Sequence, residues 1–189
     1  MASVEFALAV PLLVLLVVGA SDIVGTMRAQ LRVEMVARQL GQLVSQCNRI
    51  VAPGDIDQFW TYAQAIAGNA GRVSGGGAEG TVIISAVGLV GGASRVAWQA
   101  RTGSASHASR IGTALGTATV PGGFSVPTGQ TLFAVEVFLP RTTWPNAGAF
   151  MGGGAPRTLS GSSLFLTRAT DAPSLQTLHT NTPAPACTA

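Results

Sequence analysis

Residues 6–21 form an uncharged apolar run, which constrains the fold of this chain more than any other feature. The run reads FALAVPLLVLLVVGAS and lies between Glu5 and Asp22. As an α-helix it would be about 24 Å long, shorter than the roughly 30 Å hydrocarbon core of a bilayer. Residues 23–27 extend it to membrane-spanning length. The sequence therefore predicts a transmembrane helix over residues 1–27.

Two other interpretations compete with a membrane span. A cleaved secretory signal needs a positively charged segment before the apolar run, but the only charged side chain there is Glu5. A buried helix in a soluble core fits poorly with so unbroken an apolar surface. Only 10% of all residues are charged, against about 25% in a typical soluble domain. This composition also favours a chain that lies partly in lipid.

The basic residues exclude several kinds of chemistry. All 11 are arginine, so the chain has neither a P-loop lysine nor a Schiff-base lysine. Nucleic-acid binding needs clustered basic residues, whereas the arginines are scattered and the net charge is only +3. No nucleic-acid partner is predicted.

Two residues are unusual in so apolar a helix. Pro11 removes one backbone hydrogen bond and clashes with the preceding turn, which predicts a kink or local melting. Glu5 is a carboxylate at the edge of the apolar segment, where it is costly unless solvated or paired. It either lies among lipid headgroups or has a cationic partner, such as one from another subunit.

The string V-E-F-A-L at residues 4–8, followed by Pro11, a Leu/Val run and Gly19, resembles the N-terminus of TadE-like minor pilins. These proteins belong to the tight-adherence (Tad, or Flp) branch of type IV pili. The resemblance covers about the first 25 residues. It implies a mature chain that begins at Met1 after a prepilin peptidase has removed a short basic leader, with Glu5 and Phe6 at the family's fifth and sixth positions.

The same resemblance implies roles for individual residues. Met1, Glu5 and Phe6 would act in assembly: Glu5 neutralises the N-terminal amine of a neighbouring subunit and sets register more than stability. Pro11 and Gly19 would let the helix bend as it leaves the membrane. The implied partners are other pilins or pseudopilins through the helix, inner-membrane lipid before assembly, and the prepilin peptidase acting on the precursor.

The orientation is ambiguous from charge alone. Arg28, Arg32 and Arg38 follow the apolar segment, and the positive-inside rule would keep the C-terminal part in the cytoplasm. The resemblance instead implies a single-pass protein of the bacterial inner membrane with a periplasmic C-terminal head, which enters the extracellular pilus on assembly.

Cys47 and Cys187 are the two cysteines of the chain. They allow one intramolecular pair, whereas a metal site would need more ligands at closer spacing. A disulfide is favoured if the head is periplasmic, and two unlinked thiols are the alternative. No metal site is predicted.

The remaining chain is predicted to form a pilin-like α+β fold, in which the long N-terminal helix packs on a small antiparallel β-sheet. Apolar residues recur at three- and four-residue steps from Val36 to Val51, which predicts an amphipathic continuation of the helix over residues 28–52. Pro53 and Gly54 end it. The predicted head covers residues 53–171, and residues 172–189 form an irregular, proline-containing tail.

Within the head, Asp55 can cap a second, shorter helix. Its apolar stripe includes Phe59 and Trp60, which fit core packing better than a binding patch. Period-two patterns predict strands, with a hairpin turn at residues 91–92. The predicted strands lie at residues 81–89, 95–101, 133–139 and 164–166. Two long connections, 102–131 and 142–162, are either subunit-contact loops or disordered.

No catalytic constellation is recognisable. His107 and His179 lie in separate segments without a zinc-binding motif, and Asp55 with Asp57 fits a helix N-terminus better than a calcium site. We therefore predict no enzyme activity, catalytic residue or cofactor. The predicted function is structural: a minor pilin or pseudopilin acting in initiation, tip formation or priming of a Tad pilus for surface adhesion. The alternatives are a pseudopilin of a type II-like secretion system, and a bitopic periplasmic sensor or enzyme.

Overall fold

The computed structural model describes residues 2–148 and 152–187, with only the backbone for residues 2–5 and Leu8. Met1, one of the predicted assembly residues, lies outside the described residues. The elements are α1 (Ala2–Gln46), β1 (Val51–Pro53), α2 (Gly54–Ala67), η1 (Gly68–Ala70), β2 (Thr81–Val90), β3 (Ala93–Gly103), η2 (Pro121–Gly123), β4 (Leu132–Thr142), β5 (Pro156–Leu166), η3 (Ala172–Gln176) and β6 (His179–Thr182). We call the described residues after α1 the head.

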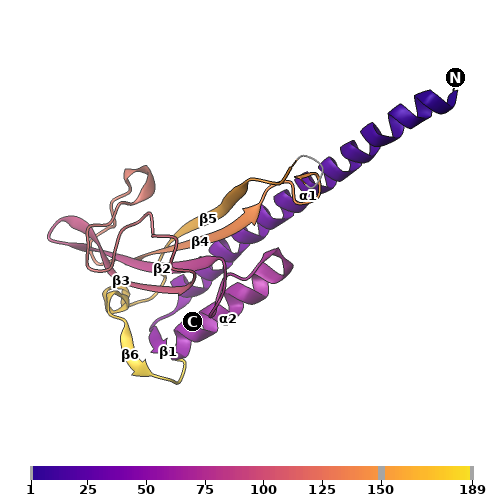
Figure 1. The fold of residues 1–189 in the computed structure, drawn as a ribbon. Coiled ribbons are helices and arrows are strands. Elements are labelled where there is room, and N and C mark those ends of the chain that lie inside the picture. Colours follow the sequence, from indigo (N-terminus) through magenta and orange to yellow (C-terminus); the bar gives the residue numbers. More distant parts are fainter. Residues whose placement is uncertain (1, 149–151, 188–189) are drawn as a thin grey trace.

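Helix α1 is a continuous helix of 45 residues, and its N-terminal half projects away from the head (Figure 1). It continues through Pro11 although proline cannot donate the usual backbone hydrogen bond. The local melting expected at Pro11 is therefore absent from the described backbone. The helix ends at Gln46, earlier than the sequence-predicted end at Pro53, since residues 51–53 pair as a strand with β6.

The predicted α+β class is confirmed, because α1 packs on a four-stranded antiparallel sheet of order β3-β2-β4-β5. Gly91 and Gly92 connect β2 to β3, and both have positive φ. Paired positive φ angles are characteristic of the tight turns that match the twist of a hairpin. Strand β5 is much longer than the predicted segment 164–166, since its first half is polar and small and gives a weak strand signal.

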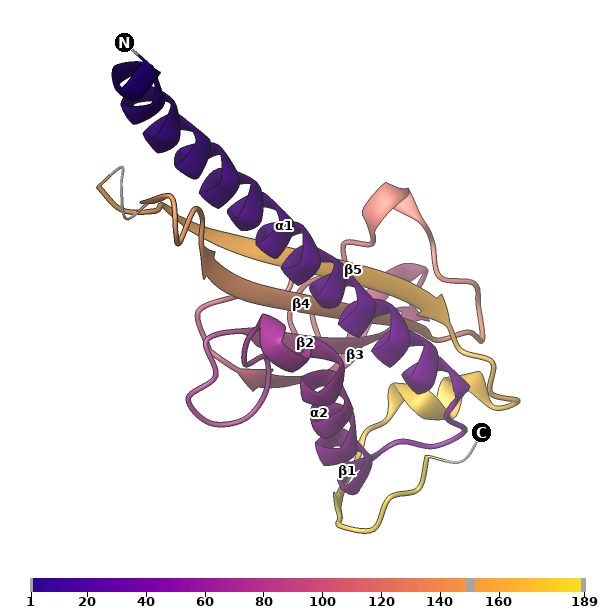
Figure 2. The same cartoon turned by 90° about the vertical axis from the view of Figure 1, so that its right-hand side faces the viewer.

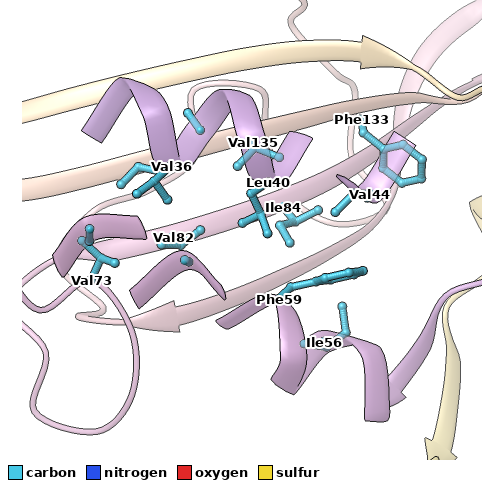
Figure 3. Packing of buried hydrophobic residues seen from close by; sticks show 14 of the residues in the cluster. Val36, Leu40, Val44, Ile56, Phe59, Val73, Val82, Ile84, Phe133 and Val135 are labelled. Atoms are coloured by element: carbon cyan, nitrogen blue, oxygen red, sulfur yellow. The ribbon is translucent and has the colours of Figure 1, made fainter. Parts of the chain in front are cut away.

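The main hydrophobic core lies between α1, α2 and one face of the sheet (Figure 3). Leu40 of α1, Phe59 of α2 and Ile84 of β2 are each at most 2% exposed. The apolar stripe predicted for α2 supplies this core, because Ile56, Phe59 and Ala63 recur at helical spacing and are buried. Trp60 is partly buried against the same cluster, which confirms packing as its role.

Two glycines allow α1 to lie directly on β5. A Cβ added at Gly161 would lie 3.0 Å from Cα of Glu34 and from the carbonyl oxygen of Val33. A Cβ at Gly41 would lie 2.6 Å from Oγ of Ser163. Ser163 also donates a hydrogen bond to the carbonyl oxygen of Ala37 at 2.6 Å. Figure 2 shows the result, with α1 running across β4 and β5.

The opposite face of the sheet is covered by the connection between β3 and β4. Ile111, Val120 and Val126 of this connection are buried in a second cluster with sheet residues such as Val87. Glu136, only 2% exposed, accepts hydrogen bonds from the Ser109 hydroxyl and the Arg110 amide. The segment predicted to be either a contact loop or disordered is thus an ordered layer of the head.

The C-terminal tail is more regular than predicted, because it contains η3 and β6. Strand β6 pairs in parallel with β1, placing His179 opposite Val51. Leu175 of η3 is buried, and its carbonyl oxygen accepts a hydrogen bond from the indole nitrogen of Trp98 at 2.8 Å. The tail therefore completes the core at the end of the head farthest from the projecting half of α1 (Figures 1 and 2).

Candidate functional site

The N-terminal half of α1 presents apolar side chains that the head does not cover. Phe6 is 70% exposed, Leu13 62% and Leu16 63%. In the most apolar window of the helix the mean hydropathy is 2.1 and only 6% of the residues are buried. A core helix of a soluble protein would be mostly buried. The described helix is long and apolar enough to cross a membrane once, or to serve as an N-terminal signal.

The second half of α1 differs, because one face of it is buried in the head. Val33, Val36, Leu40 and Val44 are at most 1% exposed. Their spacing of three or four residues places them on one side of the helix. The helix therefore combines an uncovered apolar half with a half that anchors the head. The change occurs around Asp22, which accepts hydrogen bonds from the head.

Asp22 is the charged residue that ends the apolar run, and it is hydrogen-bonded to the β4–β5 loop. This loop comprises residues 143–155, of which 149–151 lie outside the described residues. The Asp22 carboxylate accepts hydrogen bonds from Nδ2 of Asn146 at 2.6 Å, and from the amides of Asn146 at 3.1 Å and Ala147 at 2.8 Å. The residue is only 4% exposed. Three donors offset the loss of water around this carboxylate.

The same loop places an aromatic side chain beside the helix. Cζ3 of Trp144 lies 3.9 Å from the position of a Cβ at Gly19. Trp144 also lines an apolar pocket of about 260 Å³ with Ile23 and Met27. The sequence predicts flexibility at Gly19, and the structure places this residue beside the Trp144 side chain. No local sequence pattern indicates this contact, because it joins residues 125 positions apart.

Of the predicted assembly residues, Glu5 and Phe6 lie in the N-terminal part of α1, and Met1 lies outside the described residues. Glu5 belongs to the helical backbone, but its side chain is outside the described part of the chain. The Phe6 side chain is exposed, and Pro11 lies within the regular helix. The pairing of Glu5 with an amine would join two subunits and stays a prediction, as does the flexibility assigned to Pro11 and Gly19.

At the other end of α1, Cys47 and Cys187 form the disulfide expected from the sequence, with their Cα atoms 4.8 Å apart. The fully buried carboxylate of Asp55 reinforces this connection. It accepts hydrogen bonds from the amide of Val51 at 2.8 Å, Ala186 at 2.8 Å and Cys187 at 2.9 Å. The sequence predicts Asp55 as a helix cap, whereas the structure shows that its carboxylate joins the start of α2 to the C-terminal tail.

The two histidines lie in different surroundings. His107 stacks on Phe138, with ring centroids 5.2 Å apart, whereas His179 is exposed on β6. Over residues 2–148 and 152–187, no group of three or more His, Cys, Asp or Glu side chains is placed to hold a metal ion.

Comparison with known proteins identifies one family. The model of the TadE-like protein family matches residues 1–41, which confirms the resemblance seen in the sequence. The match includes the uncovered half of α1, Asp22 and most of the face that packs on the sheet. No curated protein and no solved structure gives a significant match.

Proposed function

We propose that this chain is a structural minor pilin or pseudopilin that takes part in assembling a Tad (Flp) type IV pilus. One observation carries the proposal: the residues that match the TadE-like family include a helical half that is apolar and uncovered by its own head. The role in initiation, tip formation or priming is structural rather than enzymatic.

An uncovered apolar helix needs another apolar environment. Leu12, Leu13, Leu16 and Val17 are each more than 60% exposed, and contiguous apolar surface of this kind is unfavourable in water. Lipid covers it before assembly, and the helices of neighbouring subunits cover it in the filament. Because apolar surface stays buried in both states, the transfer requires no large loss of hydrophobic free energy.

Glu5 makes the packing of α1 specific for the helices of other subunits. In a low-dielectric helix bundle a carboxylate is strongly unfavourable unless a cation pairs with it. The N-terminal amine of an adjacent subunit is a suitable cation, and the resemblance to TadE-like pilins implies this pairing. The ion pair contributes to register between subunits, because any other axial offset leaves both charges unpaired.

The head would lie in the periplasm. The Cys47–Cys187 disulfide supports this location, because disulfides persist in oxidising compartments. By the positive-inside rule, Arg28, Arg32 and Arg38 would instead favour a cytoplasmic head. We give this less weight than the disulfide, because a basic leader on the precursor would place positive charge in the cytoplasm on the other side of the helix. On this proposal the prepilin peptidase removes that leader, and inner-membrane lipid is the first partner of α1.

The proposal is tested by replacing Glu5. We expect Glu5→Ala to leave the protein in the membrane fraction and to abolish its recovery in sheared pili. Glu79→Ala is the matched control, because Glu79 is an exposed carboxylate on the head. Normal recovery of Glu5→Ala in sheared pili would contradict the proposal, as would equal loss in the control.

A further inference from the structure

Three arginines line a pocket at the end of the head nearest the projecting half of α1. The pocket has a volume of about 560 Å³ and lies between α1, η1 and the end of β4. Arg28 and Arg32 come from successive turns of one face of α1, and Arg141 comes from β4. Asn69 of η1 also lines it, and no acidic side chain does.

Among the described residues no salt bridge joins Arg28, Arg32 or Arg141 to an acidic side chain, although Asp22 attracts Arg141 electrostatically. The salt bridge among the described residues joins Arg38 to Glu34, and neither of these residues lines the pocket. Arg32 makes one long hydrogen bond of 3.4 Å to the carbonyl oxygen of Ile66, which leaves most of its donors free. Nε of Arg141 is buried and has no hydrogen-bond partner among the described residues.

Asp22 is the carboxylate that interacts electrostatically with Arg141, but its oxygens already accept hydrogen bonds from the β4–β5 loop. Arg28 and Arg32 are exposed, and they line the same pocket as Arg141, so an anion bound in the pocket would be attracted by three positive charges. Guanidinium groups present paired donors that match the oxygens of a phosphate. The pocket therefore has the chemistry of a phosphate site.

Its position along α1 indicates where the phosphate comes from. Arg28 lies seven residues beyond Ser21, the end of the uncharged run, which is about 10 Å along a helix. Headgroups occupy roughly 5–8 Å on each side of the hydrocarbon core, and an arginine side chain is long enough to reach back toward them. Arg141 lies closer, since its Nη2 is 3.7 Å from a Cβ placed at Gly25.

Trp144 gives an independent marker of where α1 leaves the hydrocarbon core. Its ring lies beside Gly19, within the last turn of the uncharged run. Tryptophan concentrates at the boundary between hydrocarbon and headgroups. With the indole at that boundary, Arg141 Nη2 lies beside Gly25, about 9 Å farther along α1. Arg28 begins about 14 Å beyond the boundary and can reach back toward the phosphates, whereas Arg32, about 20 Å beyond it, lies on the outer side of the pocket.

We propose that Arg28, Arg32 and Arg141 bind the phosphate of an anionic phospholipid headgroup. The site rests on the proposed function in one respect, namely that α1 spans the membrane with the head against its surface. Bound lipid holds the head at a fixed depth while the subunit waits in the bilayer. Its release accompanies extraction of α1.

The test uses the full chain in a neutral detergent with equal amounts of phosphatidylglycerol and phosphatidylcholine, and native mass spectrometry measures the lipid retained. We expect preferential retention of phosphatidylglycerol. Arg28→Gln with Arg32→Gln should reduce that retention about fivefold or more, because two charge-assisted contacts are lost. Arg141→Gln should act in the same direction. The matched control, Arg49→Gln with Arg95→Gln, removes two exposed arginines outside the pocket and should change retention less than twofold.

Equal retention of the two lipids by the unaltered chain would overturn the proposal, as would an equal loss in the control pair. Addition of 10 mM inorganic phosphate separates the two sources of this ligand. Displacement of the lipid by phosphate would assign the site to free phosphate instead. The lipid assay uses purified protein and needs no pilus. A negative lipid result would therefore not contradict the proposed role in pilus assembly. In the same way, failure of the Glu5→Ala pilus test would not contradict lipid binding.

Discussion

Nδ2 of Asn146 lies 2.6 Å from Oδ1 of Asp22, so a loop of the head is bonded to the helix at the residue that ends its apolar run. The amides of Asn146 and Ala147 complete the contact. This arrangement explains how a buried charge is accommodated directly after the apolar run. It also fixes the point at which the projecting half of α1 begins.

Removing the Asp22 carboxylate should therefore release the β4–β5 loop. Asp22→Ala leaves the donors of Asn146 and Ala147 without partners, which disfavours the closed loop. We expect amide exchange at Ala147 to become about tenfold faster, with the sheet core unchanged. Hydrogen–deuterium exchange of the full chain measures this. Asp57→Ala, an exposed carboxylate on α2, is the control, and unchanged protection at Ala147 in Asp22→Ala would disprove the role of the contact.

The buried carboxylate of Asp55 should be important for stability. Asp55→Ala leaves the amides of Val51, Ala186 and Cys187 unsatisfied, and unpaired buried donors cost about 1–3 kcal/mol each where water cannot replace the partner. We expect a loss of about 2–4 kcal/mol in the free energy of unfolding, measured by urea denaturation. A loss as small as that of Asp57→Ala would show that the tail amides find other partners.

The Cys47–Cys187 bridge closes a sequence separation of 140 residues. A loop of this length gives a large chain-entropy effect, and loss of a native disulfide typically costs about 2–5 kcal/mol. We expect Cys47→Ser with Cys187→Ser to lower the denaturation midpoint and to make it insensitive to reductant. If reductant leaves the midpoint of the unaltered chain unchanged, the bridge does not stabilise the head.

Gly161 should tolerate no side chain, since a Cβ there would press on the backbone of Glu34 and Val33 in α1. Overpacking of this kind costs about 1–3 kcal/mol, so Gly161→Ala should destabilise the head by that amount in urea. Gly76→Ala is the matched control, because a Cβ at Gly76 meets nothing within 4 Å. Equal stability of the two variants would mean that α1 can move away from β5 without cost.

Local patterns predicted the elements well and their tertiary contacts poorly. The apolar run, the helical stripe around Val36 and the Gly91–Gly92 turn each carry their signal within a few residues, so α1 and the β2–β3 hairpin were predictable. The parallel pairing of Val51 with His179 joins segments 128 positions apart, and no local pattern encodes it. The same pairing keeps residues 51–53 out of α1.

Buried charges were the other features that the sequence did not reveal. Asp22, Asp55 and Glu136 look like ordinary surface acids, because their partners are mostly backbone amides, which every sequence contains. The β3–β4 connection was unclear for a related reason. Its apolar residues are spaced irregularly among Gly, Ser and Thr, and they form a core only against the far face of the sheet.

The central claim is that the uncovered half of α1 leaves lipid and packs against other pilin subunits. A photo-crosslinking amino acid at Leu13 or Leu16 in intact cells tests it most directly, with Tyr62 on the head as the control position. We predict adducts with other pilins at Leu13 and Leu16 that are present in sheared pili and disappear without the prepilin peptidase. Adducts with lipid alone, unchanged by loss of the peptidase, would contradict the claim.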